Sequence, residues 1–274
     1  MSTAPSASVE KESSGGASMW DKISDFFKSF GGGGEGQRGP SGSESAESGP
    51  DGKAKKLPEL KGNAKPAAWK KLKPIKKRGT GEACPTSKNL GVVLFVHDVE
   101  SKRRDFAKRC NADRWQAVHT VTDLIEGLRS LVGDCDCVQG IMISSHGGWS
   151  GHGGFRIGDD NDGDGKIESG EARDFVSTKA EAKKFGELIK EAFCEDGFIS
   201  IESCSSSGPS NKFIKELNKA TGLTTIGSPG TANLGGSDKK GAWWKAKSGR
   251  SQVNKDGTVK TDPAKKGTGV WKPF

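Results

Sequence analysis

Two side chains that can do covalent chemistry together follow strand-length apolar runs of the sequence. His146 comes after the apolar run at 140–143, and Cys204 comes after the run at 198–201. Both runs stop at a turn rich in glycine and serine, which is typical of a buried strand that ends in a loop. In an open parallel α/β sheet the carboxyl ends of neighbouring strands meet at one crevice. If these strands are neighbours, an imidazole lies beside a thiol, and the base generates the thiolate that attacks a carbonyl.

The elements that must position this pair alternate between strands and helices. Periodicity predicts strands at 90–97, 115–121, 140–144, 198–202 and 223–227. It predicts helices at 101–110, 122–132 (capped by Thr122), 178–193 and 210–220. This alternation indicates right-handed crossovers and a mostly parallel sheet with both faces covered by helices. The sequence therefore predicts an α/β domain over residues 81–250, followed by a basic tail or edge strand at 251–274.

The two blocks resemble the signature segments of the caspase-like cysteine peptidases, the group of caspases, metacaspases, legumain, clostripain, gingipains and separase. In that group an apolar strand ends in His-Gly, as at 141–147 here. A later strand ends in an acidic or amide residue, a small residue and then Cys, as at 199–205. The resemblance covers roughly residues 88–248. It implies a caspase-like three-layer fold, in which helices flank a mostly parallel central sheet, and a cysteine endopeptidase activity.

The resemblance also implies the role of each site residue. Cys204 is the expected nucleophile and His146 the expected base, and the backbone N–H groups of Gly147 and Cys204 would form the oxyanion hole. Glu202 would line the substrate pocket, which predicts a basic residue, or alternatively Asn, on the acyl side of the cut bond. Apart from the resemblance, His97 and Asp98 end the first strand at the same sheet edge. There they line the cleft, with Asp98 in contact with the substrate, or they form a polar cluster at the end of a strand.

Other interpretations of these residues stay open. A cysteine after a buried strand is often only a small apolar filler, so Cys204 is also compatible with an inactive domain that binds a partner. His152, in a glycine-flanked loop, is a rival base. Cys135 and Cys137 with the two histidines suggest zinc, but a Cys-x-Cys spacing is short for a zinc knuckle, and a zinc ligand role for His146 would leave its strand-end position unexplained.

A second motif lies between the two blocks. Residues 160–171 match the twelve-residue EF-hand calcium loop at every diagnostic position. The predicted Ca²⁺ ligands are Asp160, Asp162, Asp164, the carbonyl of Lys166, Glu168 and Glu171. Five carboxylates so close together repel one another without a cation. Residues 155–158 look extended, so we expect a calcium loop inserted into another fold, which orders residues 147–175 at the rim of the site; the alternative is a solvated acidic loop.

The cysteine count and the N-terminus bear on the compartment. The chain has six cysteines and no basic-then-apolar secretory signal at its start. We therefore interpret the cysteines as free thiols in a reducing compartment, which predicts a cytoplasmic protein. Small apolar filler is the expected role of Cys84, Cys110 and Cys194. The chain has no apolar run long enough to span a membrane.

Positive charge is concentrated in the flanks of the chain. The net charge is +8, with eleven Lys/Arg at 53–78 and ten at 239–274. Residues 1–80 are predicted to be a flexible leader whose basic part is a solvated linker, a phosphate-binding tail or a cleavable propeptide. Residues 18–30 form an amphipathic helix in this interpretation, which binds a membrane surface or a partner protein, or folds back on its own domain. A nucleic-acid partner is disfavoured, because few aromatic residues lie among the lysines.

Overall fold

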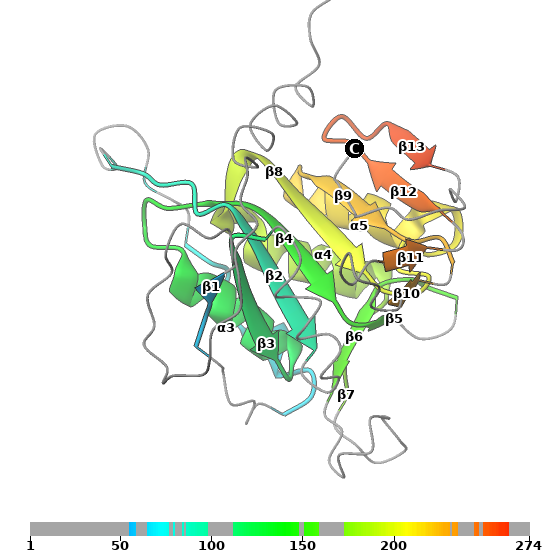
Figure 1. Cartoon of the computed structure of the whole chain (residues 1–274), viewed down its shortest axis with the longest axis horizontal. Helices are drawn as coiled ribbons and strands as arrows, with labels where there is room; N and C mark the ends of the chain where they lie inside the picture. The colour runs from blue at the N-terminus through cyan, green and yellow to red at the C-terminus, as the bar shows by residue number, and fades with distance from the viewer. Residues whose placement is uncertain are drawn as a thin grey trace, which may run out of the picture. The chain divides into compact units, whose positions relative to one another are not determined.

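The described part of the chain is built around one sheet of eight strands (Figure 1). The computed structural model describes residues 55–58, 65–76, 79, 84, 86–97, 112–147, 151–158, 173–230, 232–234, 244–246 and 249–262. The strand order is β1-β3-β2-β4-β8-β9-β12-β13. In that order the strands are Lys55–Lys56, Arg114–Val118, Val92–His97, Val138–Ser144, Phe193–Glu202, Thr224–Gly227, Arg250–Val253 and Val259–Asp262. Neighbours from β1 to β9 pair in parallel, and β12 and β13 add an antiparallel hairpin. The mostly parallel α/β sheet predicted from the sequence is confirmed.

The central strands are buried on both faces. All six residues of β2 are buried, and its sequence is a continuous run of apolar residues up to the final histidine. On one face Val93 and Phe95 belong to the largest core of the domain. On the other face Leu94 and Val96 form a smaller cluster with Trp115. Continuous apolar strands of this kind are typical of a parallel sheet whose two faces are both covered.

Three α-helices of the described residues pack on the same face of the sheet. They are α3 (Val121–Leu131), α4 (Lys179–Ile189) and α5 (Lys212–Thr221). Short 3₁₀ turns are η1 (Ala68–Lys71), η3 (Lys190–Ala192) and η4 (Pro209–Asn211). Leu124, Phe185 and Leu217, one from each α-helix, share the largest core with Phe95. These three helices form one layer on that face. The helix predicted at 101–110 lies outside the described residues.

Two of the helices begin at threonines that cap them. The Thr120 hydroxyl accepts from the N–H of Asp123, whose carboxylate accepts in return from the N–H of Thr120. Thr178 and Glu181 form the same reciprocal pair at the start of α4. Each cap stabilises its helix by about 1 kcal/mol. The predicted cap at Thr122 is wrong, because that residue lies inside the first turn of α3.

Two smaller sheets flank the main one. The first has the order β5-β6-β7, and the second pairs β10 with β11. Their strands are His146–Gly147, Phe155–Gly158, Arg173–Val176, Ala232–Leu234 and Trp244–Ala246. The extended conformation expected at 155–158 is confirmed by β6. Strands β6 and β7 form an antiparallel hairpin that joins the ends of the predicted calcium loop, which itself lies outside the described residues.

The lysine-rich segment 65–76, predicted as part of a flexible leader, is packed onto the domain. We call it the N-terminal strap. Trp69 is completely buried and Ile75 is nearly so, and both side chains belong to the largest core. The carboxylate of Asp174 on β7 accepts from the backbone N–H of Ala67 at 2.8 Å. The burial of these two large apolar side chains stabilises the packed segment, although lysines surround them in the sequence. The prediction of a solvated linker is therefore wrong for this segment.

Four of the six cysteines form two disulfides. The bonds join Cys84 to Cys135 and Cys137 to Cys194. The interpretation of all six cysteines as free thiols is therefore wrong, and so is the apolar-filler role expected for two of them. The disulfides also remove the two thiolates from the zinc set considered above. Among the described residues, Cys204 is the cysteine that lies outside both disulfides.

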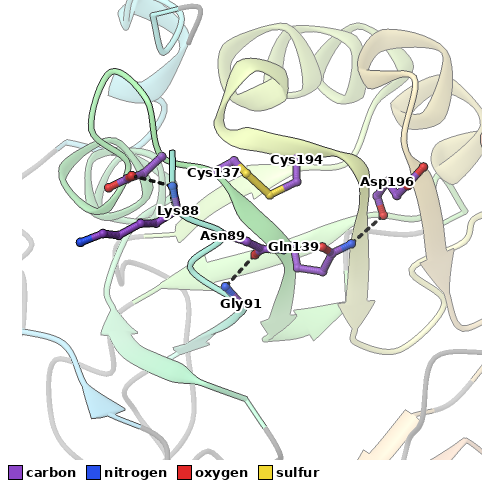
Figure 2. The surroundings of a disulfide bond; sticks show 8 residues. Lys88, Asn89, Gly91, Cys137, Gln139, Cys194 and Asp196 are labelled. Atoms are coloured by element: carbon purple, nitrogen blue, oxygen red, sulfur yellow. Dashed lines mark hydrogen bonds between the residues drawn. A yellow bond between two sulfur atoms is a disulfide. The ribbon is translucent and has the colours of Figure 1, made fainter. Parts of the chain in front are cut away.

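The bond between Cys137 and Cys194 joins the first residues of two neighbouring strands (Figure 2). Cys137 directly precedes β4, and Cys194 is the second residue of β8. Beside them the amide of Asn89 donates to the Gln139 side chain at 2.7 Å. The Gln139 amide donates in turn to the backbone carbonyl of Asp196 at 2.9 Å. The disulfide and this pair of hydrogen bonds hold three segments together at the start of the sheet.

The sheet continues beyond the predicted end of the domain. β12 pairs with β9 on one side and with β13 on the other, so β13 is an edge strand within the segment predicted as tail or edge strand. The described domain therefore extends to residue 262 instead of ending at 250. No helix of the described residues has the length and apolar composition needed to cross a membrane.

Candidate active site

Adjacent parallel strands bring the two reactive segments to the same sheet edge. β4 and β8 pair in parallel, and the last paired residues are Ser144 and Glu202. His146 and Cys204 each follow two residues later, at equivalent positions beyond the sheet. Figure 1 shows β4 and β8 side by side with their carboxyl ends on the same edge. The predicted adjacency of the two strands is confirmed.

The backbones of the two segments are in direct contact at Gly147. A Cβ atom built on Gly147 would lie 2.2 Å from the carbonyl oxygen of Cys204 and 3.2 Å from its Cβ. No real Cβ tolerates the first of these distances, so only glycine allows this approach. The sequence predicted Gly147 as a donor of the oxyanion hole. The structure adds that glycine is needed already for the approach of Cys204.

Cys204 lies in a turn that its serine neighbours hold in place. The Ser206 hydroxyl donates to the carbonyl of Ile201 at 2.9 Å and accepts from the N–H of Ser228 at 2.8 Å. Ser205, the residue after the cysteine, has a φ of 51°. A left-handed conformation is costly for a residue other than glycine, and such residues are found most often at functional sites. Cys204 itself is partly exposed, whereas Ser206 is buried.

His146 lies at the start of the short strand β5, which pairs with β6. The register places His146 opposite Arg156 and Gly147 opposite Phe155. The His146 side chain is half-buried. Its ring contacts the ring of His97, with centroids 5.5 Å apart and planes at 66°. The imidazole is therefore fixed by a strand on one side and by a second histidine, the last residue of β2, on the other.

The turn after Cys204 is docked on the loop that precedes β6. The N–H of Gly154 donates to the carbonyl of Ser206 at 2.9 Å, and the Ser203 hydroxyl donates to the carbonyl of Gly154 at 3.2 Å. Gly153 packs so closely that a Cβ there would lie 2.5 Å from the backbone nitrogen of Gly208. His152, the rival base, is exposed in the same loop. Residues 153–154 thus connect the cysteine turn to the strand that pairs with His146.

Glu202 is buried and has partners within the chain. The residue is only 1% exposed. The Ser200 hydroxyl donates to it at 2.5 Å, and a guanidinium nitrogen of Arg250 on β12 lies 3.8 Å away. Burial raises the pKa of the Glu202 carboxyl, and the Arg250 charge and the Ser200 hydrogen bond partly oppose this. The sequence did not indicate Arg250, since it lies in the segment predicted as the end of the domain.

Some predicted site residues lie outside the described residues. They are Asp98 and the calcium ligands Asp160, Asp162, Asp164, Lys166, Glu168 and Glu171. The strands on either side of the calcium motif are described, and Gly158 pairs with Arg173 across the hairpin. The motif is therefore the connection of a hairpin whose first strand also pairs with His146. A donor set of five carboxylates and a carbonyl fits a hard cation such as Ca²⁺.

Comparison of the chain with protein-family models, with curated proteins and with solved structures found no match. The functional inferences below therefore depend on the residues and the geometry of this chain.

Proposed function

We propose that the protein is a caspase-like cysteine endopeptidase in which Cys204 and His146 form the catalytic pair. The observation that supports this most is the register of β4 and β8, which sets both residues two positions beyond the last paired residues. The contact of Gly147 with the backbone of Cys204 supports it further. A partly exposed thiol outside any disulfide, next to an imidazole, is the arrangement that nucleophilic catalysis needs.

The reaction follows from these groups. The Cys204 thiolate attacks the carbonyl carbon of a peptide bond, a C–S bond forms, and the carbonyl electron pair moves to oxygen. The backbone N–H groups of Gly147 and Cys204 stabilise that oxyanion. His146 gives its proton to the leaving nitrogen as the C–N bond breaks. It then takes a proton from water, which attacks the acyl-enzyme, and the C–S bond breaks to release the acid and the thiolate.

The preference for a basic residue on the acyl side of the cut bond stays part of this proposal. Glu202 is paired with Arg250 inside the chain, so a cationic substrate side chain would have to take the place of that guanidinium. A panel of fluorogenic peptides that differ only at this residue tests the preference. Faster cleavage after Arg or Lys is expected, and faster cleavage after Asp would contradict it.

Alkylation of the thiol tests the catalytic pair without knowledge of the substrate. The measurement is the rate at which iodoacetamide modifies Cys204, read by peptide mass spectrometry, in wild type and His146→Ala. Cys110→Ser serves as the background, so that Cys204 is the one remaining cysteine that neither of the two described disulfides uses. We expect wild type to react about 100-fold faster than the His146→Ala variant, the order of magnitude of general-base assistance. If Cys204 is modified at the same rate in wild type and in His146→Ala, and both rates equal that of the urea-unfolded chain, the thiol is not activated. The protein would then be better described as an inactive domain that binds a partner.

We further propose that residues 160–171 bind Ca²⁺ and that binding stabilises the β6–β7 hairpin. The hairpin supports this, because it brings the two ends of the motif together at Gly158 and Arg173. A cation that binds only the folded loop adds about 2.7 kcal/mol of stability at 100 times its Kd. Thermal unfolding with Ca²⁺ and with EGTA measures this. The double substitution Asp160→Asn/Glu171→Gln should abolish the difference in Tm between Ca²⁺ and EGTA. A wild-type Tm that is the same in Ca²⁺ and in EGTA would contradict the proposal.

The disulfides lead to a proposal on the compartment. Two disulfides are expected of a protein that folds under oxidising conditions, and this replaces the cytoplasmic prediction drawn from free thiols. Protein isolated from its natural source and alkylated in urea without reductant tests it. With four of six cysteines bonded, two cysteines should be labelled. Labelling of all six would restore the reducing compartment.

A further inference from the structure

His97 lies closer to the candidate catalytic histidine than its place in the sequence suggests. It ends β2, the strand that pairs with β4 on the side opposite β8. The last pairing joins Val96 to Ser144, so His97 lies level with Ser145, one residue before His146. The side chain is completely buried, and its ring meets the His146 ring edge-on with centroids 5.5 Å apart. Three adjacent strands therefore lead to His97, His146 and Cys204: β2 ends at His97, and the other two residues follow the ends of β4 and β8.

A hydrogen bond from β6 favours one tautomer of the neutral His97 ring. The backbone N–H of Gly158, the last residue of β6, donates to Nδ1 of His97 at 3.4 Å. A ring nitrogen that accepts a hydrogen bond carries no proton, so the proton of the neutral ring is on Nε2. β6 also pairs with His146 through Arg156. One strand thus sets both the backbone position of His146 and the tautomer of the histidine against which its ring packs.

We propose that His97 is a positioning residue for His146. It keeps the His146 ring in the orientation that serves Cys204, by edge contact on one side and by its bond to β6 on the other. A neutral ring is required, since a second imidazolium at this distance would disfavour protonation of His146, which must protonate the leaving amine. The inference rests on the proposed function, because a positioning role has meaning only if His146 acts on Cys204.

Nuclear magnetic resonance of ¹⁵N-histidine tests the inference in the unmodified chain. The chain has four histidines, so each ring is assigned by single substitution. Long-range ¹H–¹⁵N spectra distinguish the two neutral tautomers and the charged ring. We expect His97 as the Nε2–H tautomer at neutral pH. A proton on Nδ1, or a doubly protonated ring, would overturn the proposal without any need for a variant.

Two substitutions separate the two contacts of His97. His97→Asn keeps an acceptor near the position of Nδ1 but removes the ring, whereas His97→Phe keeps a ring against His146 but removes the acceptor. Each should slow iodoacetamide modification of Cys204 by about 10- to 100-fold, the range expected for a misplaced catalytic group. Each should also shift the His146 ring resonances. A solely structural role would change Tm while the reaction rate of folded protein and the His146 signals stayed as in wild type.

The outcomes distinguish this inference from the proposed function. If Cys204 of the wild type reacts no faster than in His146→Ala, the catalytic pair fails whatever His97 does. If the wild type reacts fast and depends on His146, but both His97 variants stay within about twofold of it, only the positioning role fails. Slow reaction in both variants, with folded spectra, supports the role of His97.

Discussion

The two ends of the β4–β8 strand pair use sulfur in opposite ways. At the start of the strands Cys137 and Cys194 are joined by a disulfide, beside the hydrogen bonds of Gln139. At the other end, about 20 Å away for strands of this length, Cys204 keeps its thiol next to the His146 segment. One end is held covalently, and at the other end we find close backbone contacts and serine hydrogen bonds. Stability and reactivity should therefore be separable on the same two strands.

The largest expected effect comes from removal of the disulfide. Cys137→Ala/Cys194→Ala should lower the free energy of unfolding by about 4 kcal/mol, because the bond closes a long loop of the unfolded chain. The Cys204 alkylation rate of the folded protein should stay within about twofold of wild type. Urea unfolding and timed alkylation measure the two quantities.

The other disulfide provides the matched control. Its sequence separation is 51 residues, against 57 for the bond between β4 and β8. Cys84→Ala/Cys135→Ala should therefore cost a similar free energy. A collapse of Cys204 reactivity in the first variant alone would show that the covalent end also positions the reactive end.

The next effect is expected at the reactive end itself. Gly147→Ala would place a methyl group 2.2 Å from the Cys204 carbonyl oxygen, so the two segments must separate. Catalytic geometry displaced in this way should slow Cys204 alkylation by about 100-fold. Gly133→Ala at the disulfide end is the control, because its nearest contact would be a relaxed 3.7 Å from Asp136. Equal rates in the two variants would mean that the Gly147 contact does not govern reactivity.

A smaller effect concerns pH. Burial raises the pKa of Glu202 above its ordinary value of 4.5, so the unfolded chain loses this proton first as the pH rises. Glu202 therefore contributes stability that is present below pH 4.5 and is lost as the pH rises through the raised pKa of the folded state. Relative to Glu202→Gln, wild type should lose unfolding free energy as the pH rises above 4.5.

Glu195→Gln, at the disulfide end of the same strand, controls for the charge change. Its carboxylate is exposed, so the substitution should alter the unfolding free energy by less than about 0.5 kcal/mol. If wild type instead gains stability over Glu202→Gln with rising pH, the attraction of Arg250 outweighs the burial of Glu202.

The parts of the fold with strong local patterns could be predicted from the sequence. β2, β4 and β8 are apolar runs that end at polar turns, and this pattern also located His146 and Cys204. The cap of α3 was predicted two residues late, because Thr120 and Thr122 are equivalent by type. Only the reciprocal hydrogen bonds with Asp123 distinguish them.

The remaining features depend on contacts between distant residues. The disulfides join cysteines more than fifty residues apart, and spacing along the chain carries no sign of such pairs. Trp69 is surrounded by lysines, so local composition predicts a solvated segment although the indole is buried. The contact of His97 with His146 can be predicted only if the strand order is known. The strands that lead to the two histidines, β2 and β4, are neighbours in the sheet but are separated in sequence by β3 and α3.

The burial of Trp69 determines what happens to the chain after proteolytic cleavage in the lysine-rich region. A peptide ending just beyond Ile75 would retain its indole in the core, its contact with Asp174 and its hydrogen bond to Leu188. A processed protein would then be a nicked molecule: two bands on a denaturing gel, yet one species in gel filtration.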